Sequence, residues 1–509
     1  MDYKNVASIL SQLLILFVLS MMVSLAIAGY EYLDYSNDES RASLMAFGGA
    51  IAVNILTIIL LKWFSRGAEG RLFIREALLL VCLFWVIGGV LCSLPYYFWA
   101  RLLGHESHAF SQFINCFFEG MSGLTTTGAS ILSDIEAIPG SLLFWRASIQ
   151  WLGGLGIVVM FVAVLPWLSG GKNKIFRAEA TGPTGGENVA NLRSSTQNLF
   201  FIYSFFTAIV IVLLRITDTN LGWLPALTFA FSTTATAGFS MFNDSTATLS
   251  TAGQWVCIIF MFLCGVNFKL FNQAIQTRSL KPFRNTEFRW YVSFICISAL
   301  FIFIDISINP YLDMSGLVVS DNLWRSLTDA SFNVVAIQTT TGFSNANTDT
   351  FPAASKILLC FLMLVGGCAG STGGGMKVAR MTIAWSMIRI EIEKAFRPAL
   401  VKAVKSDQRV IDHRTQKSVL IFIVAGFFIM FVGASLISLF DPHVELVTVV
   451  SASVACFNNI GPGFSLVGAT QNYQFFSAST KALLSLFMIL GRLEVFSVLV
   501  ILSPVFWRR

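Results

Sequence analysis

The sequence predicts an all-α, multi-pass membrane protein made of two N-terminal helices followed by four repeated helix–loop–helix units. The chain of 509 residues has a mean hydropathy of +0.71, with 55% hydrophobic and only 12% charged residues. Soluble proteins carry about 25% charged residues. Apolar runs long enough for a helix to cross a bilayer, about 20 residues, recur along the chain. Four short, similar stretches that contain glycine interrupt this pattern.

The crossing helices follow from the apolar runs in order. The first two runs, 6–29 and 43–63, each predict one helix, and the first lacks a small-residue cleavage site, so we interpret it as a retained span. The four units predict paired crossings at 73–99 and 141–168, 198–216 and 253–276, 287–308 and 354–395, and 417–440 and 480–502. The chain thus divides into a helix pair (1–70) and four repeats: 71–170, 171–280, 281–400 and 401–509.

Between the two helices of each unit lies an apolar segment that is too short to span a bilayer. These segments have 11 to 15 residues and cover 111–123, 224–234, 323–337 and 444–457. Such lengths are typical of re-entrant helices. Each one leads into a glycine-containing turn.

The four turns resemble one another. They read LTTTGAS from Leu124, ATAGFS from Ala235, QTTTGFS from Gln338 and NNIGPGFS from Asn458. An isolated Thr-Gly pair is usually an ordinary helix-ending turn. Four pairs at matched positions in successive repeats indicate a shared role instead. The central glycines, spaced by 110, 104 and 119 residues, are Gly128, Gly238, Gly342 and Gly461.

The fourth turn departs from the others, because Asn replaces Thr and Gly463 offers a second register. We choose Gly461, because Ala455 then aligns with Ala336 of the third turn.

These turns suit the binding of a cation. Irregular backbone at membrane depth is tolerated only where it is packed in protein or lines a wet cavity. Glycine allows the positive φ values that turn successive carbonyls to one side, and threonine adds a hydroxyl oxygen. Rings of such oxygens replace the hydration shell of potassium in channels, and each re-entrant helix would point its negative C-terminal end at the ion. We therefore expect the repeats to surround one ion pore with pseudo-fourfold symmetry.

The distribution of charge predicts the orientation of the chain. Most of the 34 Lys and Arg residues lie in the stretches 62–76, 171–197, 277–289 and 377–417 and near the two termini. By the positive-inside rule this side, with both termini, is cytoplasmic. Acidic residues prevail on the other side, where they would attract cations; the alternative is that they simply avoid the cytoplasmic side.

The four turns in order, together with GGCAGSTGGG at 366–375, resemble the Trk/Ktr/HKT potassium transporters, and in particular their bacterial TrkH/TrkG branch. The resemblance covers nearly the whole chain and implies potassium uptake through a selectivity filter. A glycine at Gly128 is similar to the potassium-selective members rather than to the sodium-permeable ones, which have serine there. The implied filter residues are Thr125, Thr126, Thr127, Gly128, Ala235, Thr236, Ala237, Gly238, Thr339, Thr340, Thr341, Gly342, Asn458, Asn459, Ile460 and Gly461.

The same resemblance implies the setting of the protein. It implies a homodimer in the bacterial inner membrane that works with a cytoplasmic TrkA-type RCK regulatory ring. A nucleotide, ATP/ADP or NAD(H), is expected only on that partner, and no cofactor is expected in this chain. Potassium at the filter is the only metal ion expected, and no nucleic acid is expected to bind.

A glycine-rich segment and one arginine are the candidate gate. Six glycines in ten residues do not form a stable helix, since each costs about 1 kcal/mol relative to alanine. The resemblance implies an intramembrane loop below the filter; the alternative is a tight helix–helix contact. Arg492 is predicted in the middle of a span, where a charge usually faces a cavity or a partner. The resemblance implies that it projects into the pore below the filter and raises the barrier to a cation; the alternative is a structural ion pair with a neighbouring helix. Lys269 is a second candidate but lies nearer a span end. The gate residues are Gly366, Gly367, Gly370, Ser371, Thr372, Gly373, Gly374, Gly375 and Arg492.

The sequence leaves three classes of function to consider. The leading one is a gated potassium channel, with an ion-coupled (H⁺ or Na⁺) potassium symporter as the alternative; parallel repeats weaken an alternating-access carrier. An enzyme is disfavoured because ionisable residues within the spans are few and unpaired. GGKNK from Gly170 is too short for a nucleotide-binding P-loop, and His105 with His108 lacks further metal ligands. The basic segment 377–417, with ten Lys or Arg residues, would either contact anionic lipid or dock the regulatory ring.

Overall fold

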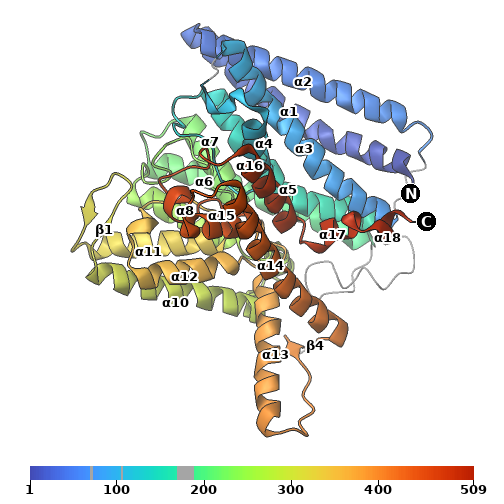
Figure 1. Ribbon diagram of the computed structural model, residues 1–509, viewed down its shortest axis with the longest axis vertical. Helices are drawn as coiled ribbons and strands as arrows, with labels where there is room; N and C mark the ends of the chain where they lie inside the picture. Colours follow the sequence, from blue (N-terminus) through green and yellow to red (C-terminus); the bar gives the residue numbers. More distant parts are fainter. Residues whose placement is uncertain (69–72, 105–106, 169–188, 408, 509) are drawn as a thin grey trace.

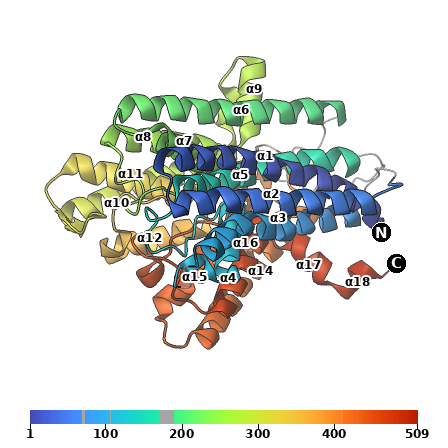
Figure 2. The same ribbon diagram turned by 90° about the horizontal axis from the view of Figure 1, so that it is seen from above.

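The computed structural model describes residues 1–68, 73–104, 107–168, 189–407 and 409–508. The described chain is mostly helical (Figures 1 and 2), which confirms the all-α prediction. Its strands form two short antiparallel pairs, β1 (Tyr311–Leu312) with β2 (Val318–Val319) and β3 (Lys405–Ser406) with β4 (Arg409–Val410). Most of the expected basic stretch 171–197 lies outside the described residues, as do His105 and the whole GGKNK segment.

The two predicted N-terminal helices are present. They are α1 (Tyr3–Tyr35) and α2 (Asp38–Phe64), which pack against each other along their length and against α3 of the first unit. Their outward faces expose large apolar residues such as Leu19, Met22, Leu56 and Ile59, as expected for helices surrounded by lipid.

Each unit has a long first helix, a short helix at the segment predicted to be re-entrant, and a second helix. The first helices are α3 (Ile74–Leu103), α6 (Val189–Thr217), α10 (Thr286–Ile308) and α14 (His413–Phe440). The short helices are α4 (Phe113–Leu124), α7 (Trp223–Ala235), α11 (Leu323–Gln338) and α15 (Leu446–Phe457). They coincide with the predicted re-entrant segments to within a few residues. The one-turn helices η1 (Ala109–Ser111), η3 (Lys281–Arg284), η4 (Thr348–Thr350) and η5 (Ser465–Val467) lie in the connections.

The second helices are interrupted more often than the sequence predicts. The first unit has α5 (Gly140–Leu168), whereas the others are split into α8 (Thr251–Cys264) and α9 (Phe268–Thr277), α12 (Ala353–Leu364) and α13 (Val378–Phe396), and α16 (Ala478–Arg492), α17 (Phe496–Leu502) and α18 (Pro504–Trp507). Among the described residues, six helices are long and apolar enough to cross a membrane, or seven when α8 and α9 count as one span. All six are N-terminal helices or first helices of a unit.

The segments predicted to cross the membrane at 253–276 and 480–502 are therefore not single continuous helices. Helices α8 and α9 meet at an angle of 85°, because the carbonyl of Gly265 accepts from the N–H of Cys368 (2.9 Å) and Asn267 caps α9. Helix α16 ends at Arg492, after which Glu494 has a φ of 55°. Arg492 thus lies at a helix end, not in the middle of a helix.

Carboxylates fix how the two helices of a unit meet. At the end of α6, Asp218 accepts from the N–H of Ser250, which caps α8 (2.7 Å). In the third unit, Asp305 of α10 accepts from Ser355 of α12 (3.2 Å). In the fourth, Asp441 after α14 accepts from the Ser477 N–H (3.2 Å) and hydroxyl (3.0 Å) before α16. An anionic group at a helix N-terminus is stabilised by the helix dipole, so this contact recurs as a structural element of the repeats.

The capping role of Asp441 gives a stability prediction. Asp441→Ala removes the acceptors that hold Ser477, the N-cap residue of α16, and a weakened N-cap costs about 1 kcal/mol. We expect a lower melting temperature for the purified protein in detergent. Asp34→Ala, at an exposed position near the end of α1, is the control. Equal melting temperatures for the two variants would contradict the capping role.

Candidate ion pore

The four glycine turns share one backbone conformation. The residue two positions before each glycine has a left-handed φ: 55° at Thr126, 51° at Thr236, 59° at Thr340 and 55° at Asn459. The glycines themselves have φ values of 81°, 81°, 75° and 100° in the order Gly128, Gly238, Gly342 and Gly461. L-residues rarely adopt positive φ, so its recurrence at matched positions shows that the turns are built alike.

The N–H groups of the turns point back toward the re-entrant helices. In each turn, the residue just before the glycine donates to the carbonyl six residues before that glycine. These bonds are Thr127 to Ser122 (2.8 Å), Ala237 to Ser232 (3.0 Å), Thr341 to Ala336 (2.8 Å) and Ile460 to Ala455 (3.0 Å). Gly461 therefore occupies the matched position in the fourth turn, whereas the N–H of Gly463 bonds to the Val467 carbonyl (2.7 Å).

The turns meet one another in a closed cycle. A Cβ atom added to Gly128 would lie 2.3 Å from the carbonyl oxygen of Ala237, and one on Gly238 would lie 2.1 Å from that of Thr341. The corresponding distances are 1.8 Å from Gly342 to the Ile460 oxygen and 2.6 Å from Gly461 to the Thr127 oxygen. Each glycine thus abuts the residue that precedes the next glycine, in the order one, two, three, four and back to one.

Side chains at the base of the turns are packed together without contact with solvent. The Thr125 and Thr127 hydroxyls lie 2.8 Å apart, and the Thr339 and Thr341 hydroxyls 2.7 Å apart. The Asn459 amide donates to the Thr127 hydroxyl (3.0 Å), so the fourth turn contacts the first. The predicted filter residues of all four turns therefore lie together; every Thr and Asn among them is at most 1% exposed.

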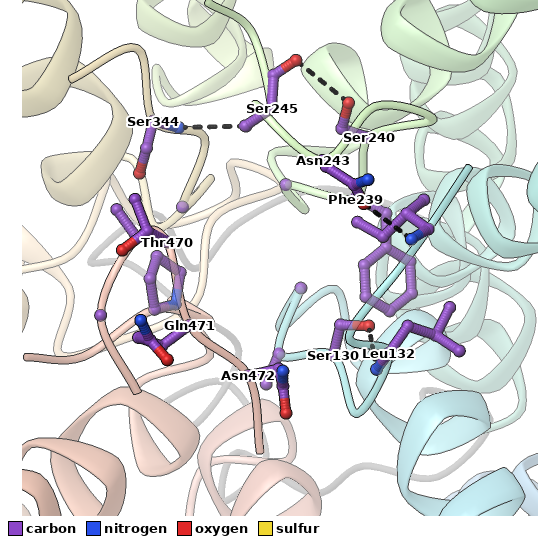
Figure 3. Close-up of a pocket in the computed structure, with 18 of the residues that line it drawn as sticks. Ser130, Leu132, Phe239, Ser240, Asn243, Ser245, Ser344, Thr470, Gln471 and Asn472 are labelled. Atoms are coloured by element: carbon purple, nitrogen blue, oxygen red, sulfur yellow. Dashed lines mark hydrogen bonds between the residues drawn. The ribbon is translucent and has the colours of Figure 1, made fainter. Parts of the chain in front are cut away.

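One face of this cycle opens into a cavity of about 290 Å³, which we call the vestibule. Side chains from all four units surround it (Figure 3), among them Ser130, Ser240, Ser344 and Asn472. Its floor includes Gly128, Gly238, Gly342 and Pro462. The vestibule therefore leads directly to the turns.

Contacts between neighbouring units close the rim of the vestibule. Thr246 donates to the Ser344 carbonyl through its N–H (3.2 Å) and its hydroxyl (2.9 Å). Between the third and fourth units, the Ser465 N–H donates to Asp349 (2.8 Å). The pKa of the Asp349 carboxyl is raised, because the effect of burial exceeds the opposing effects of the Ser465 hydrogen bond and the nearby Lys356. The Tyr473 N–H donates to the Ser130 carbonyl (2.8 Å) and so joins the fourth unit to the first.

The segment 366–375, which we call the gate loop after its predicted role, lies against the other face of the turns. A Cβ on Gly373 would lie 2.8 Å from the Thr339 oxygen, and one on Gly374 would lie 2.7 Å from the Asn458 oxygen. The Gly374 N–H donates to the Thr340 hydroxyl (2.6 Å), and the Thr372 hydroxyl bonds to that of Thr236 (3.0 Å). The predicted gate glycines with Ser371 and Thr372 thus form one loop packed under turns two, three and four.

The gate loop is held by three charged side chains. Arg492 is 4% exposed and donates to the carbonyls of Thr372 (2.8 Å) and Gly153 (3.1 Å). Lys377 donates to the Gly373 carbonyl, and Glu287 of α10 accepts from the Ala369 N–H (2.6 Å). Lys269, the second candidate from the sequence, is instead a partly exposed residue in the first turn of α9.

Sequence reasoning missed several residues behind the turns. Arg146 of α5 pairs with Glu119 of α4, and both are at most 1% exposed. One turn further along α5, Gln150 donates to the Ala237 carbonyl (2.7 Å). The sequence does contain a sign of this arrangement, because Arg146 and Gln150 are polar residues four positions apart in an otherwise apolar helix. No group of three or more potential metal-ligating His, Cys, Asp or Glu side chains occurs within the described residues.

Comparison with known proteins matches this geometry to one family. The family model for TrkH, a cation transport protein, matches residues 44–508. The Trk system potassium uptake protein TrkH of Salmonella typhimurium is 32% identical and that of Halomonas elongata 33% identical, each over 100% of both chains. The crystal structure of the potassium transporter TrkH from Vibrio parahaemolyticus superimposes with a TM-score of 0.84 at 26% identity, again over 100% of both chains. The chain is thus a multi-pass membrane protein that belongs to the TrkH family of cation transport proteins.

Proposed function

We propose that this chain is the potassium-conducting membrane subunit of a Trk-type potassium uptake system in a bacterial inner membrane. The observation that supports it best is the closed cycle of the four glycine turns. On this proposal the units surround one axis with pseudo-fourfold symmetry. The names of the full-length relatives, each a Trk system potassium uptake protein, support potassium as the transported ion.

In the proposed filter, backbone carbonyls of the four turns replace the water around potassium. The turn N–H groups are occupied by the re-entrant helices, which leaves carbonyl oxygens to face the axis. The C-terminal ends of α4, α7, α11 and α15 precede the turns, so their negative helix ends favour a cation there. Uptake would be driven by the membrane potential, which contributes about 2.3 kcal/mol per charge per 100 mV.

In the proposed gating mechanism, the gate loop obstructs the path below the filter. It contacts turns two to four, and the Arg492 guanidinium lies against it with a positive charge that repels a cation. Displacement of the loop would open the path. Six glycines make such a movement easy, because glycine has the widest choice of backbone conformations.

The regulatory partner is proposed to act on the gate loop through α13. Helix α13 follows the gate loop directly, and together with β3 and β4 it extends away from the rest of the molecule (Figure 1). A cytoplasmic nucleotide-binding ring of the TrkA type that docked on this basic segment could therefore pull on the loop. Cytoplasmic termini and a homodimer complete the proposal.

The filter assignment predicts the effect of a side chain at Gly128. In Gly128→Ser, the new Cβ would approach the Ala237 carbonyl to 2.3 Å at a φ of 81°, so the ring must widen or distort. We expect the potassium-to-sodium flux ratio of purified protein in liposomes to fall by about tenfold or more, which corresponds to about 1.4 kcal/mol. Gly48→Ser is the matched control, because no atom lies within 4 Å of its added Cβ. An unchanged ratio in Gly128→Ser would count against the filter.

The gate assignment predicts a gain of flux. Arg492→Gln removes a positive charge and weakens the bonds to the Thr372 and Gly153 carbonyls. Rubidium flux into liposomes without a regulatory partner should rise by about tenfold, as expected for a barrier lowered by about 1.4 kcal/mol. The potassium-to-sodium ratio should not change, because the filter is intact. Arg389→Gln, on the exposed part of α13, is the control; equal flux from both variants would refute the role of Arg492.

A further inference from the structure

A buried ion pair lies behind the first two turns. Arg146 of α5 and Glu119 of α4 are 1% and 0% exposed, and their Nη2 and Oε1 atoms lie 2.7 Å apart. The Arg146 Nε atom donates to the same carboxylate oxygen (2.8 Å). Removing two charges from water is costly, and excellent geometry with further hydrogen bonds is needed to offset that cost. The pair therefore needs a reason beyond stability of the fold.

The partners of the pair belong to the turns themselves. Arg146 donates to the Ser240 carbonyl and to the Ser130 hydroxyl, both at 3.1 Å. Its guanidinium also lies over the Phe239 ring, 4.0 Å from the ring centre. These residues are the first and second after the glycines of turns one and two. Arg146 thus joins the ends of two neighbouring turns at the wall of the vestibule; its partners Ser130 and Ser240 are labelled in Figure 3.

Glu119 holds the first turn from the other side. Its Oε1 atom accepts from the Ser130 hydroxyl (3.0 Å) and its Oε2 atom from the Ile131 N–H (3.0 Å). The carboxylate also neutralises Arg146, which otherwise would place an unpaired positive charge beside the cation path. The ion pair therefore combines a mechanical role with an electrostatic one.

The pair is specific to the first unit. Glu119 lies nine residues before its glycine, and the matched residues of the other units are Phe229, Asn333 and Ala452. In the third unit, the residue at the matched position is Asn333, which makes an uncharged hydrogen bond by donating to the Asn345 side chain (2.9 Å). Among the described residues, a charged fork holds both turns only between turns one and two, so this junction depends on arginine geometry. A lysine would supply one point charge without the planar fork.

We propose that Arg146 and Glu119 are positioning residues that fix the spacing of turns one and two and thereby set the discrimination between potassium and sodium. The inference rests on the proposed function, because it concerns the filter that those turns would form. Arg146 would act on the turns through Ser130 and Ser240, and Glu119 through Ser130 and Ile131.

The test measures potassium, rubidium and sodium flux in liposomes for four variants of the full chain. Arg146→Lys keeps the charge and loses the fork, so we expect folded protein whose potassium-to-sodium flux ratio falls by about tenfold, as for loss of a hydrogen bond to a charged group. Glu119→Gln leaves Arg146 unpaired, so we expect both the yield of folded protein and the cation flux to fall. Combining Glu119→Gln with Arg146→Gln removes both charges and should restore folding but not selectivity. Arg215→Lys is the control, since this arginine also lies over an aromatic ring, at 5.0 Å, but does not line the vestibule.

The potassium-to-sodium flux ratio distinguishes a positioning role of Arg146 and Glu119 from a purely structural role. A purely structural pair would change yield and melting temperature and leave the flux ratio of the folded protein intact. A normal ratio in folded Arg146→Lys, or in the double variant if the lysine variant does not fold, overturns the inference. The potassium-to-sodium flux ratio of Gly128→Ser distinguishes failure of this inference from failure of the proposed filter. If that ratio falls while the ratios of the Arg146 variants are normal, only this inference fails. If it too is normal, the proposed filter fails and this inference fails with it.

Discussion

The structure depends on the close approach of four backbone turns, each of which presents a glycine to the carbonyl of the next. A Cβ at any of these glycines would come within 2.6 Å of that oxygen, well inside normal contact distance. The absence of four side chains therefore allows the turns to meet at all. The re-entrant helices support this arrangement. Their carbonyls accept from the N–H groups of the turns, and their C-terminal ends point toward the point where the four turns meet.

The second helices of the units break to accommodate a second layer of irregular backbone beneath the turns. The Gly265 carbonyl accepts from Cys368, and the Gly370 carbonyl accepts from Phe268. The bend between α8 and α9 therefore supplies partners for the gate loop, in a region where unpaired backbone groups would be costly. Arg492 at the end of α16 adds a charged donor. The four turns and the loop at 366–375 thus form one packed unit, and a movement of the loop would change its contacts with turns two to four.

Much of this architecture was predictable from local sequence. Apolar runs of sufficient length marked the first helix of each unit, and the spacing of Gly128, Gly238, Gly342 and Gly461 marked the repeats. The bend at Gly265–Asn267 was not predictable, because its cause is a hydrogen bond to Cys368, about 100 residues away in the sequence. The pairing of Arg146 with Glu119 was not predictable for a related reason. An apolar sequence indicates that a helix is buried, but it does not indicate which charged residue of another helix will face a given side chain.

The proposed function requires cations to bind at the centre of the glycine cycle. The direct measurement is an experimental density map of the purified protein in rubidium, compared with one in sodium. The account predicts a rubidium peak surrounded by carbonyl oxygens of Thr127, Ala237, Thr341 and Ile460, weaker or absent in sodium. A rubidium map with no peak there, or with its strongest peak away from these four oxygens, would contradict it.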